Sequence, residues 1–309
     1  MMRQIHSNKP QRGAVLLSLT IVISLVGVLW LYSNLATHHR NIRTQQALNM
    51  AQSALIGRAV ADLNRAGSLP CPDTNNDGVA ELLTGVQCPS YIGRLPWRTL
   101  GLSDVRDDAG ERLWYALSPD VRDASGNIVN SALTTGQLLI NANAQQVAIV
   151  FAPNAVITPQ ARDGAQQNNV SQYLDGSNAD GDTHYESRQI DDSGFNDHVR
   201  AISQIHLFKQ VEKHALQQFA VAIQQYDTSH HVYPYAGNAT GEMQSGLLSG
   251  FIPYATLALA SSAWAQNLWF TALDAVPYSV DATLGSVQLR LRYCQANVTR
   301  GQVMQVQCG

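Results

Sequence analysis

The sequence predicts an α+β protein in which a long N-terminal helix, first transmembrane and then amphipathic, packs on an antiparallel-sheet head followed by a second α+β lobe. Three observations predict it: an uncharged apolar stretch, a helical apolar stripe directly after it, and a set of motifs that occurs twice. The 309 residues are enough for about two domains, and a hydrophobic share of 45% excludes wholesale disorder. A net charge of −3 provides no basic field for nucleic acid.

The N-terminal helix is expected to begin inside the membrane. Residues 14–32 read AVLLSLTIVISLVGVLWLY, 19 residues without a charge. As a helix this stretch is roughly 28 Å long, which just covers a bilayer core. A cleaved secretory signal has a shorter apolar region and a small-x-small cleavage site, and residues 33–36 form only a poor one. The pattern therefore favours a retained anchor.

The apolar pattern continues as one helical stripe beyond the anchor, at Leu48, Ala51, Leu55, Ala59 and Leu63. Gly67 is a natural helix end, and Pro70 follows it closely. The sequence therefore predicts one rod helix over residues 14–66, with its first half apolar all round and its second half docked on a head.

A basic leader, residues 1–13, precedes this rod, and no acidic residue occurs before Asp62. A leader ending in Gly13, an apolar helix starting at Ala14 and a globular head together resemble type IV pilin-like proteins. The string QRGAVLLSLTIV resembles their minor-pilin branch. This resemblance implies that a prepilin peptidase cuts between Gly13 and Ala14 and methylates the new amine. It also implies other minor and major pilins as partners of the N-terminal helix.

One position departs from the family pattern. The family's usual glutamate at the fifth mature position, which offsets a neighbouring subunit's ammonium inside an apolar bundle, is Ser18 here. The departure suits a subunit at the filament tip. We therefore expect a minor pilin or pseudopilin, not an enzyme, that primes assembly, caps a type IV pilus or adheres to surfaces. It would be a single-pass protein of the bacterial inner membrane, with a cytoplasmic N-terminus and a periplasmic head, before joining the tip.

Two alternatives stay open. The first is the large tip pseudopilin of a type II secretion system, which also lacks the glutamate and can bind calcium. The extra domain of that protein is helical, whereas the second half of this chain has mixed α and β patterns. The second alternative, from a different class, is an envelope receptor or enzyme on a single anchor, which would keep its leader.

The head contains an internal repeat. A first copy, residues 54–117, has a helical stripe, then GRLPWRTLGL and then LWYAL; a second copy, residues 215–273, has a helical stripe, then GFIPYATLAL and then LWFTAL. Matching order and spacing indicate duplication. We therefore expect a first lobe over residues 67–165 and a second over residues 205–309. Residues 166–204 are rich in Asn, Asp and Gly and are predicted as a linker.

The four cysteines allow three pairings. The nearest-neighbour choice joins Cys71 to Cys88 and Cys294 to Cys308, and the second loop also resembles the disulfide-bounded loop of pilin heads. No Cys-x-x-Cys spacing indicates a zinc site. Disulfides indicate an oxidising compartment, which agrees with a periplasmic head.

One motif indicates a metal. Asp73-x-Asn75-x-Asp77-Gly78 places oxygen side chains at alternate positions, and Glu81 could join them around a calcium ion. The twelfth position, where a full EF-hand has a bidentate acid, is Thr84. The alternative is a turn held by its own Asx hydrogen bonds.

The remaining polar motifs do not indicate a metal site or a catalytic site. A second, looser acidic loop at Asp175, Asn178, Asp180 and Asp182 is better explained as solvated linker than as a calcium loop. The sequence contains no Gly-x-Ser-x-Gly, phosphate loop or His-Glu-x-x-His motif, and the paired histidines have no acid at coordinating spacing. Four large aromatic residues are expected to pack the lobes: Trp97, Trp114, Tyr254 and Trp269.

Overall fold

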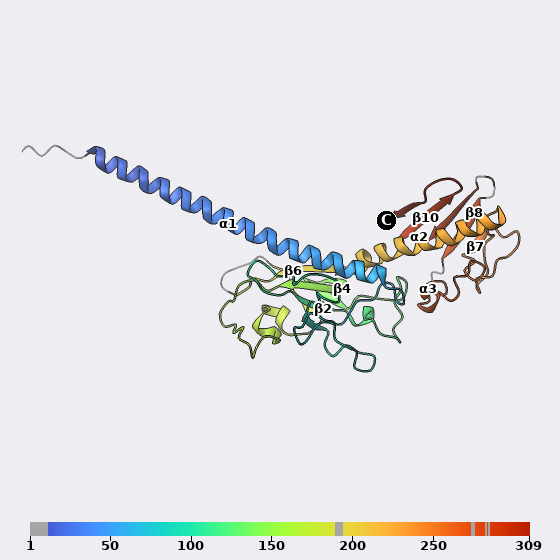
Figure 1. The fold of residues 1–309 in the computed structure, drawn as a ribbon, viewed down its shortest axis with the longest axis horizontal. Coiled ribbons are helices and arrows are strands. Elements are labelled where there is room, and N and C mark those ends of the chain that lie inside the picture. Colours follow the sequence, from blue (N-terminus) through green and yellow to red (C-terminus); the bar gives the residue numbers. More distant parts are fainter. Residues whose placement is uncertain (1–11, 189–193, 273–275, 282, 284) are drawn as a thin grey trace, which may run out of the picture.

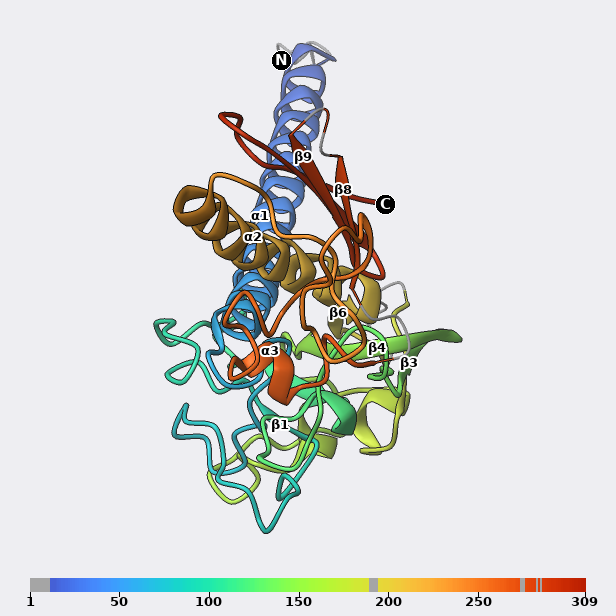
Figure 2. The same cartoon turned by 90° about the vertical axis from the view of Figure 1, so that its right-hand side faces the viewer.

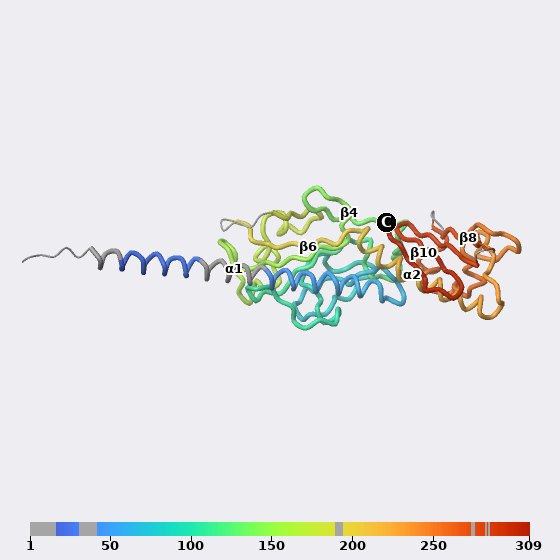
Figure 3. Tube along the Cα trace, turned by 90° about the horizontal axis from the view of Figure 1, so that it is seen from above, coloured from blue at the N-terminus to red at the C-terminus, as the bar shows by residue number. Residues whose placement is uncertain are grey.

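The structure is a computed structural model that describes residues 12–188, 194–272, 276–281, 283 and 285–309; the side chains of residues 12–16 and 31–41 also lie outside this description. One long helix passes along a first lobe, and a second lobe lies beyond the end of that helix (Figure 1). Viewed from above, the N-terminal part of the helix projects away from both lobes (Figure 3).

The rod helix α1 spans Arg12–Ala61. It ends before the predicted residue 66 because the Asp62 carboxylate accepts N–H bonds from Asn64 at 2.8 Å and Arg65 at 2.7 Å, and so replaces helical bonding. Of the predicted stripe, Leu48, Ala51, Leu55 and Ala59 are fully buried. Leu63 lies past the helix end and is 85% exposed, so its placement on the stripe was wrong.

A six-stranded mixed sheet forms the first lobe under the C-terminal half of α1, which contacts β4 and β6. The strands occur in the order β1-β2-β4-β3-β5, with β6 also paired to β4. Their bounds are β1 Ile92–Arg94, β2 Trp114–Leu117, β3 Leu138–Ile140, β4 Asn143–Ala152, β5 His184–Tyr185 and β6 His198–Ser203. Strand β4 contains the apolar run VAIVFA, which is wholly buried.

Two features of this sheet differ from the sequence-based expectation. Strands β3 and β5 are parallel, so the sheet is not purely antiparallel. Residues 166–204, expected as a linker, contribute β5 and β6 to the first sheet, and β6 pairs with β4 along most of its length. Short 3-10 turns at Val170–Gln172 and Gly176–Ala179 precede them, so this segment belongs to the first lobe.

The second lobe pairs helix α2, Gln204–His230, with a five-stranded antiparallel sheet of order β11-β10-β9-β8-β7. Figure 2 shows α2 crossing beside the end of α1. The remaining bounds are β7 Ser249–Phe251, α3 Ala263–Gln266, β8 Pro277–Asp281, β9 Ser286–Arg290, β10 Cys294–Thr299 and β11 Gln305–Cys308. The apolar face of α2 is buried at Leu207, Val211, Leu216, Phe219 and Ile223.

Both lobes build the same turn from the repeated motif. The Trp97 N–H donates to the Leu95 carbonyl at 2.8 Å, and the Tyr254 N–H donates to the Ile252 carbonyl at 2.8 Å. Each ring covers a glycine with positive φ: a Cβ on Gly78 or on Gly241 would lie 2.5 Å from it. A side chain at either glycine would therefore displace the ring.

The third predicted equivalence, LWYAL with LWFTAL, is wrong. Residues 113–117 include strand β2, but Trp269 of the second string lies in no strand. Its indole N–H donates instead to the Val129 carbonyl of the first lobe at 3.1 Å. The counterpart of β2 is β8, since each pairs with the strand before the shared turn. The Tyr115 hydroxyl on β2 also donates to a proline carbonyl at 3.2 Å, as does that of Tyr278 on β8 at 2.7 Å.

Candidate functional site

The N-terminal part of α1 exposes apolar side chains on all sides. Ten of them between residues 17 and 30 are each 51–66% exposed: Leu17, Leu19, Ile21, Val22, Ile23, Leu25, Val26, Val28, Leu29 and Trp30. Across the described residues, we find no helix with an apolar stretch long enough to cross a membrane. The span predicted over residues 14–32 includes side chains outside the description, at residues 14–16, 31 and 32.

The predicted peptidase site lies at the start of the same helix. Leader residues 1–11 lie outside the described part of the chain. Gly13 and Ala14 lie within the first turn of α1, and their side chains are not among those described.

Both predicted disulfides are present. Cys71–Cys88 closes a loop of the first lobe, and Cys294–Cys308 joins residues directly opposite one another on β10 and β11. In the first lobe, the disulfide encloses the Asp-rich motif proposed for calcium.

In that motif, the buried Asp73 carboxylate is surrounded by backbone donors. It accepts N–H bonds from Asn75 at 3.1 Å, Asn76 at 2.6 Å and Gly78 at 2.7 Å. Burial raises the pKa of Asp73 despite these bonds. The same carboxylate therefore shapes the turn that brings Gly78 under Trp97.

The other three candidate ligands also bond within the loop. Asn75 Oδ1 accepts from the Asp77 N–H at 2.9 Å, and Asp77 Oδ1 accepts from Val79 at 2.7 Å. Glu81 Oε1 accepts from both the N–H and the hydroxyl of Thr74. This geometry fits the Asx-turn alternative better than a ligand set. Calcium binding at Asp73, Asn75, Asp77 and Glu81 stays a prediction.

The second lobe provides an internal comparison for this loop. There the equivalent turn before Gly241 is held by Asn238, whose side-chain oxygen accepts N–H bonds from Thr240 and Glu242 at 3.0 Å each. A neutral amide therefore suffices to hold such a turn. Within the described residues, no three His, Cys, Asp or Glu side chains lie close enough to share a metal ion.

The second acidic loop divides into an exposed and a buried part. Asp180 and Asp182 are exposed, as expected for a solvated segment. Asp175 and Asn178 are buried beside Asp197, a residue that the sequence patterns did not single out. Burial, together with the charge of Asp175, raises the pKa of Asp197 to about 8. The only sequence signal for this carboxylate is its position directly before the strand HVRAIS.

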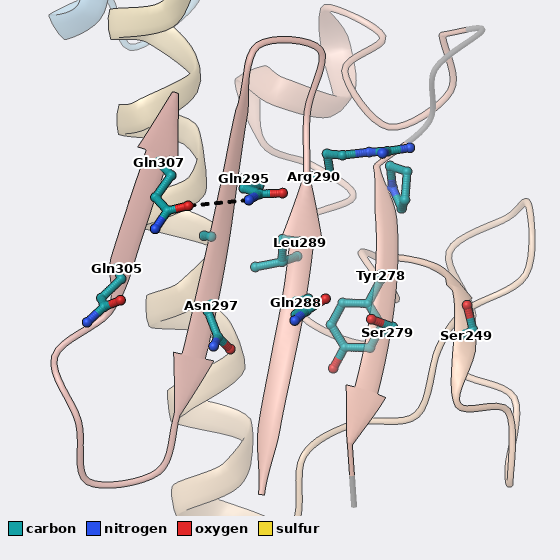
Figure 4. A pocket seen from close by; sticks show the side chains of 12 residues that line it. Ser249, Tyr278, Ser279, Gln288, Leu289, Arg290, Gln295, Asn297, Gln305 and Gln307 are labelled. Carbon is teal, nitrogen blue, oxygen red and sulfur yellow. Dashed lines mark hydrogen bonds between the residues drawn. The ribbon is translucent and has the colours of Figure 1, made fainter. Parts of the chain in front are cut away.

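A shallow groove of about 460 Å³ lies on one face of the second sheet (Figure 4). A row of neutral polar side chains crosses all five strands in register: Ser249, Ser279, Gln288, Asn297 and Gln305. Arg290 is the one charged residue among the described residues that line it. Tyr278 and Leu289 also line it but are buried below the face. The groove can therefore form many neutral hydrogen bonds.

The aromatic residues expected to pack the lobes do so. Trp114 and Trp269 are buried, and Trp97 and Tyr254 are half-buried over their glycines. The Arg94 guanidinium lies 4.3 Å from the Trp114 ring centroid and 3.9 Å from that of Tyr173, so it packs as a core cation.

Of the two histidine pairs, the structure describes the side chains of one, and it forms no metal-binding group with other described His, Cys, Asp or Glu residues. His230 and His231 are exposed at the C-terminal end of α2, and the side chains of His38 and His39 lie outside the description.

No known protein family, curated protein or solved structure matches this chain, so its function has to be inferred from its residues and their geometry.

Proposed function

We propose that this protein is a type IV pilin-like minor subunit that acts at a filament tip, in assembly priming, capping or surface adhesion. The observation that carries the proposal is the division of α1. One continuous helix buries a stripe in the first lobe from Leu48 to Ala59 and exposes apolar side chains on all sides from Leu17 to Trp30. An apolar surface of this kind needs lipid or other apolar helices around it.

The exposed half of α1 suits both environments. We propose that it holds the chain in the bacterial inner membrane before assembly and then packs against the equivalent helices of other pilins. Packing among like helices replaces the lipid contacts. No acidic residue precedes Asp62, so this part of the chain brings no buried carboxylate into a bundle and offers none to a neighbour's ammonium. This supports a place at the tip.

The second lobe favours a minor pilin over the large tip pseudopilin of a secretion system. That protein's extra domain is helical, whereas this lobe combines α2 with a five-stranded antiparallel sheet. A head of two such lobes would also crowd a tightly packed shaft, which favours few copies at one end. The two disulfides fit a head outside the cytoplasm.

The test is the mature N-terminus. The full chain is produced in a bacterial host lacking prepilin peptidase, with and without that enzyme supplied, and the purified protein is measured by intact mass and N-terminal peptide mass spectrometry. We expect a start at N-methylated Ala14 only when the peptidase is present. A Gly13→Leu variant is the matched control and should keep its leader in both hosts.

An intact leader on the wild-type chain in both hosts would overturn the proposal and favour an anchored receptor or enzyme. A peptidase-dependent cut leaves the choice of filament. Pull-down of the methylated protein with the components of a pilus or of a secretion system then decides between them.

A further inference from the structure

The groove on the second sheet is lined by the side chains that point away from the core. Along β9, Val287 and Leu289 are buried in the core that α2 packs on, and Gln288 between them is exposed. Strand β10 repeats this alternation around the exposed Asn297. Successive residues of a strand point to opposite faces of the sheet, so the exposed side chains of neighbouring strands share the groove (Figure 4).

Uncharged amides and hydroxyls dominate the lining. Five of the twelve residues that line the groove are glutamine or asparagine, and two are serine. Each amide has two N–H donors and one carbonyl acceptor. Among the described residues, the one hydrogen bond between these side chains joins Gln295 Nε2 to Gln307 Oε1, at 3.5 Å (Figure 4). Most of the amide donors and acceptors are therefore available to a ligand.

This face lacks the charges that usually protect an exposed sheet. Strand β11 is the last strand in the order of the second sheet. Edge strands commonly carry lysine or other charges, which prevent pairing with foreign chains. Strand β11 reads Gln-Val-Gln-Cys and has none, and Arg290 on β9 is the one charged side chain among the described lining residues. A neutral face of this size beside an unprotected edge indicates a binding surface.

An apolar ledge borders the polar side chains. Phe251 follows Ser249 by two residues on β7, so both side chains lie on the same face of the sheet. In the register of the strands, Phe251 is directly opposite Pro277, which lines the groove. Phe251 is 38% exposed. An exposed aromatic ring beside hydrogen-bonding groups suits a ligand that has apolar C–H faces and polar edges.

The dimensions of the groove suit an extended ligand. Neighbouring strands lie about 4.8 Å apart, so the row from Ser249 to Gln305 crosses five strands over about 19 Å. The volume of about 460 Å³ lies within the ~300–1,000 Å³ that is usual for ligand sites. Similar hydrogen-bonding groups at a regular spacing match a chain of similar units better than a compact ligand.

We propose that this groove binds a neutral glycan. Sugar hydroxyls both donate and accept hydrogen bonds, as the amides do, and an uncharged chain needs no counter-charge from the protein. A nucleic acid would need several cations for its phosphates, and the described lining offers Arg290 alone. The centre of a protein interface is usually apolar, whereas the centre of this face carries Gln288 and Asn297.

This inference deepens the adhesion role in the proposed function and rests on that role only for its purpose. The second lobe lies at the end of the molecule away from the projecting part of α1 (Figures 1 and 3). A groove on this lobe would stay clear of helices packed around the rod. A chain that is not cut by prepilin peptidase would lose the filament role and keep the glycan site. A chain that is cut but binds no glycan would lose only the site.

The test uses the full chain in a zwitterionic detergent, because a detergent with a sugar head group would compete for the groove. The protein is applied to immobilised neutral oligosaccharides of glucose, mannose, galactose and N-acetylglucosamine, with sialylated and sulfated oligosaccharides beside them. The strongest neutral ligand is then titrated by calorimetry. We expect a Kd between about 1 μM and about 1 mM, with an affinity that increases with the length of the oligosaccharide.

Paired variants place the binding in the groove. Gln288→Ala together with Asn297→Ala removes two amides from its centre and should weaken binding by at least about tenfold. The matched control is Gln224→Ala together with Gln225→Ala, which removes two exposed amides from α2 and should bind as wild type. All four side chains are exposed, so both double variants should keep the wild-type Tm.

Four results would overturn the proposal. The first is wild-type protein that binds none of the neutral oligosaccharides at millimolar concentration. The second is binding of acidic oligosaccharides alone, lost in Arg290→Gln, which would assign the face to an anion. The third is self-association that the groove variant abolishes without any glycan binding, which would assign the face to a second copy of the chain. The fourth is equal binding by the groove variant and its control. If the groove variant does not fold, Gln295→Ala together with Gln307→Ala replaces it.

Discussion

Glu212 provides the most demanding test of how the second lobe is held together. It lies on α2 with no exposed surface, and its Oε2 accepts N–H bonds from Tyr293 and Cys294 at 2.8 Å each. These two N–H groups stand where the chain enters β10, next to the Cys294–Cys308 disulfide. The side chain therefore connects the helix to the sheet.

Glu212→Ala removes the acceptor from both N–H groups. At about 1–3 kcal/mol for each unsatisfied donor, we expect the free energy of unfolding to fall by about 2–4 kcal/mol, since water can partly reach Tyr293. Glu212→Gln keeps one oxygen in place and avoids a buried charge. It should therefore stay within about 1 kcal/mol of wild type at neutral pH.

The pH dependence separates charge from hydrogen bonding. Burial raises the pKa of Glu212 above its unfolded value of 4.5. The native state therefore binds more protons than the unfolded state between the two values. This contribution to stability is complete below the unfolded pKa and is lost as pH rises through the folded pKa. Glu212→Gln should lack this slope and equal or exceed wild type at pH 8.

The assay is guanidinium unfolding of the full chain in detergent, with disulfides oxidised, followed by the fluorescence of the buried tryptophans at pH 5 and pH 8. The reasoning requires that the glutamine variant is tolerated and the alanine variant is costly, so the two serve as controls for each other. A Glu212→Gln variant as unstable as Glu212→Ala would refute the reasoning, because it would show that the charge itself is needed. If Glu212→Ala lowers the free energy of unfolding by less than about 1 kcal/mol, the two hydrogen bonds to Glu212 do not stabilise the lobe as argued.

Three further predictions concern the first lobe and its contact with the second. Asn267→Ala should lower the free energy of unfolding by about 1–3 kcal/mol, because its amide donates to the Asn64 carbonyl at 2.9 Å; unchanged denaturant midpoints would contradict this. Asp73→Asn should keep most of the wild-type Tm, since Asn238 holds the equivalent turn, whereas Asp73→Ala should lose far more; equal losses would refute the equivalence. A Cys71→Ser, Cys88→Ser double variant should lose about 2–4 kcal/mol in the same unfolding assay, and no loss would mean that the bridge is dispensable.

Local periodicity predicted much of the fold. The stripes on α1 and α2 follow a helical repeat, and a run such as VAIVFA is buried wherever a sheet forms around it. Nearest-neighbour cysteines were close enough in sequence to pair whatever the topology. The repeated Leu-Pro-Trp and Ile-Pro-Tyr strings were visible because their residues are adjacent in the sequence, whereas the glycines that Trp97 and Tyr254 cover, Gly78 and Gly241, lie outside these strings.

Long-range pairing accounts for the failures. Strand β6 binds β4 through backbone groups, and a sequence rich in Asn, Asp and Gly does not reveal such a partner. LWFTAL resembles LWYAL in composition, yet Trp269 packs against the first lobe instead of forming a strand. The calcium ligands predicted in the Asp73 loop are a separate case: they were chosen by spacing, and calcium binding there stays a prediction. Spacing does not show which oxygens the loop's own N–H groups already occupy.

The sequence by itself determined the surfaces of this protein: an apolar rod, two amphipathic helices and two covalent loops, all encoded by neighbouring side chains. Only the tertiary structure determined which acidic side chains are buried and which stay exposed to solvent. Asp180 and Asp197 have the same carboxylate, but one is exposed and the other is enclosed by Asp175 and Asn178 from another segment. Burial and electrostatic energy depend on these distant neighbours, so they arise only when the chain has folded.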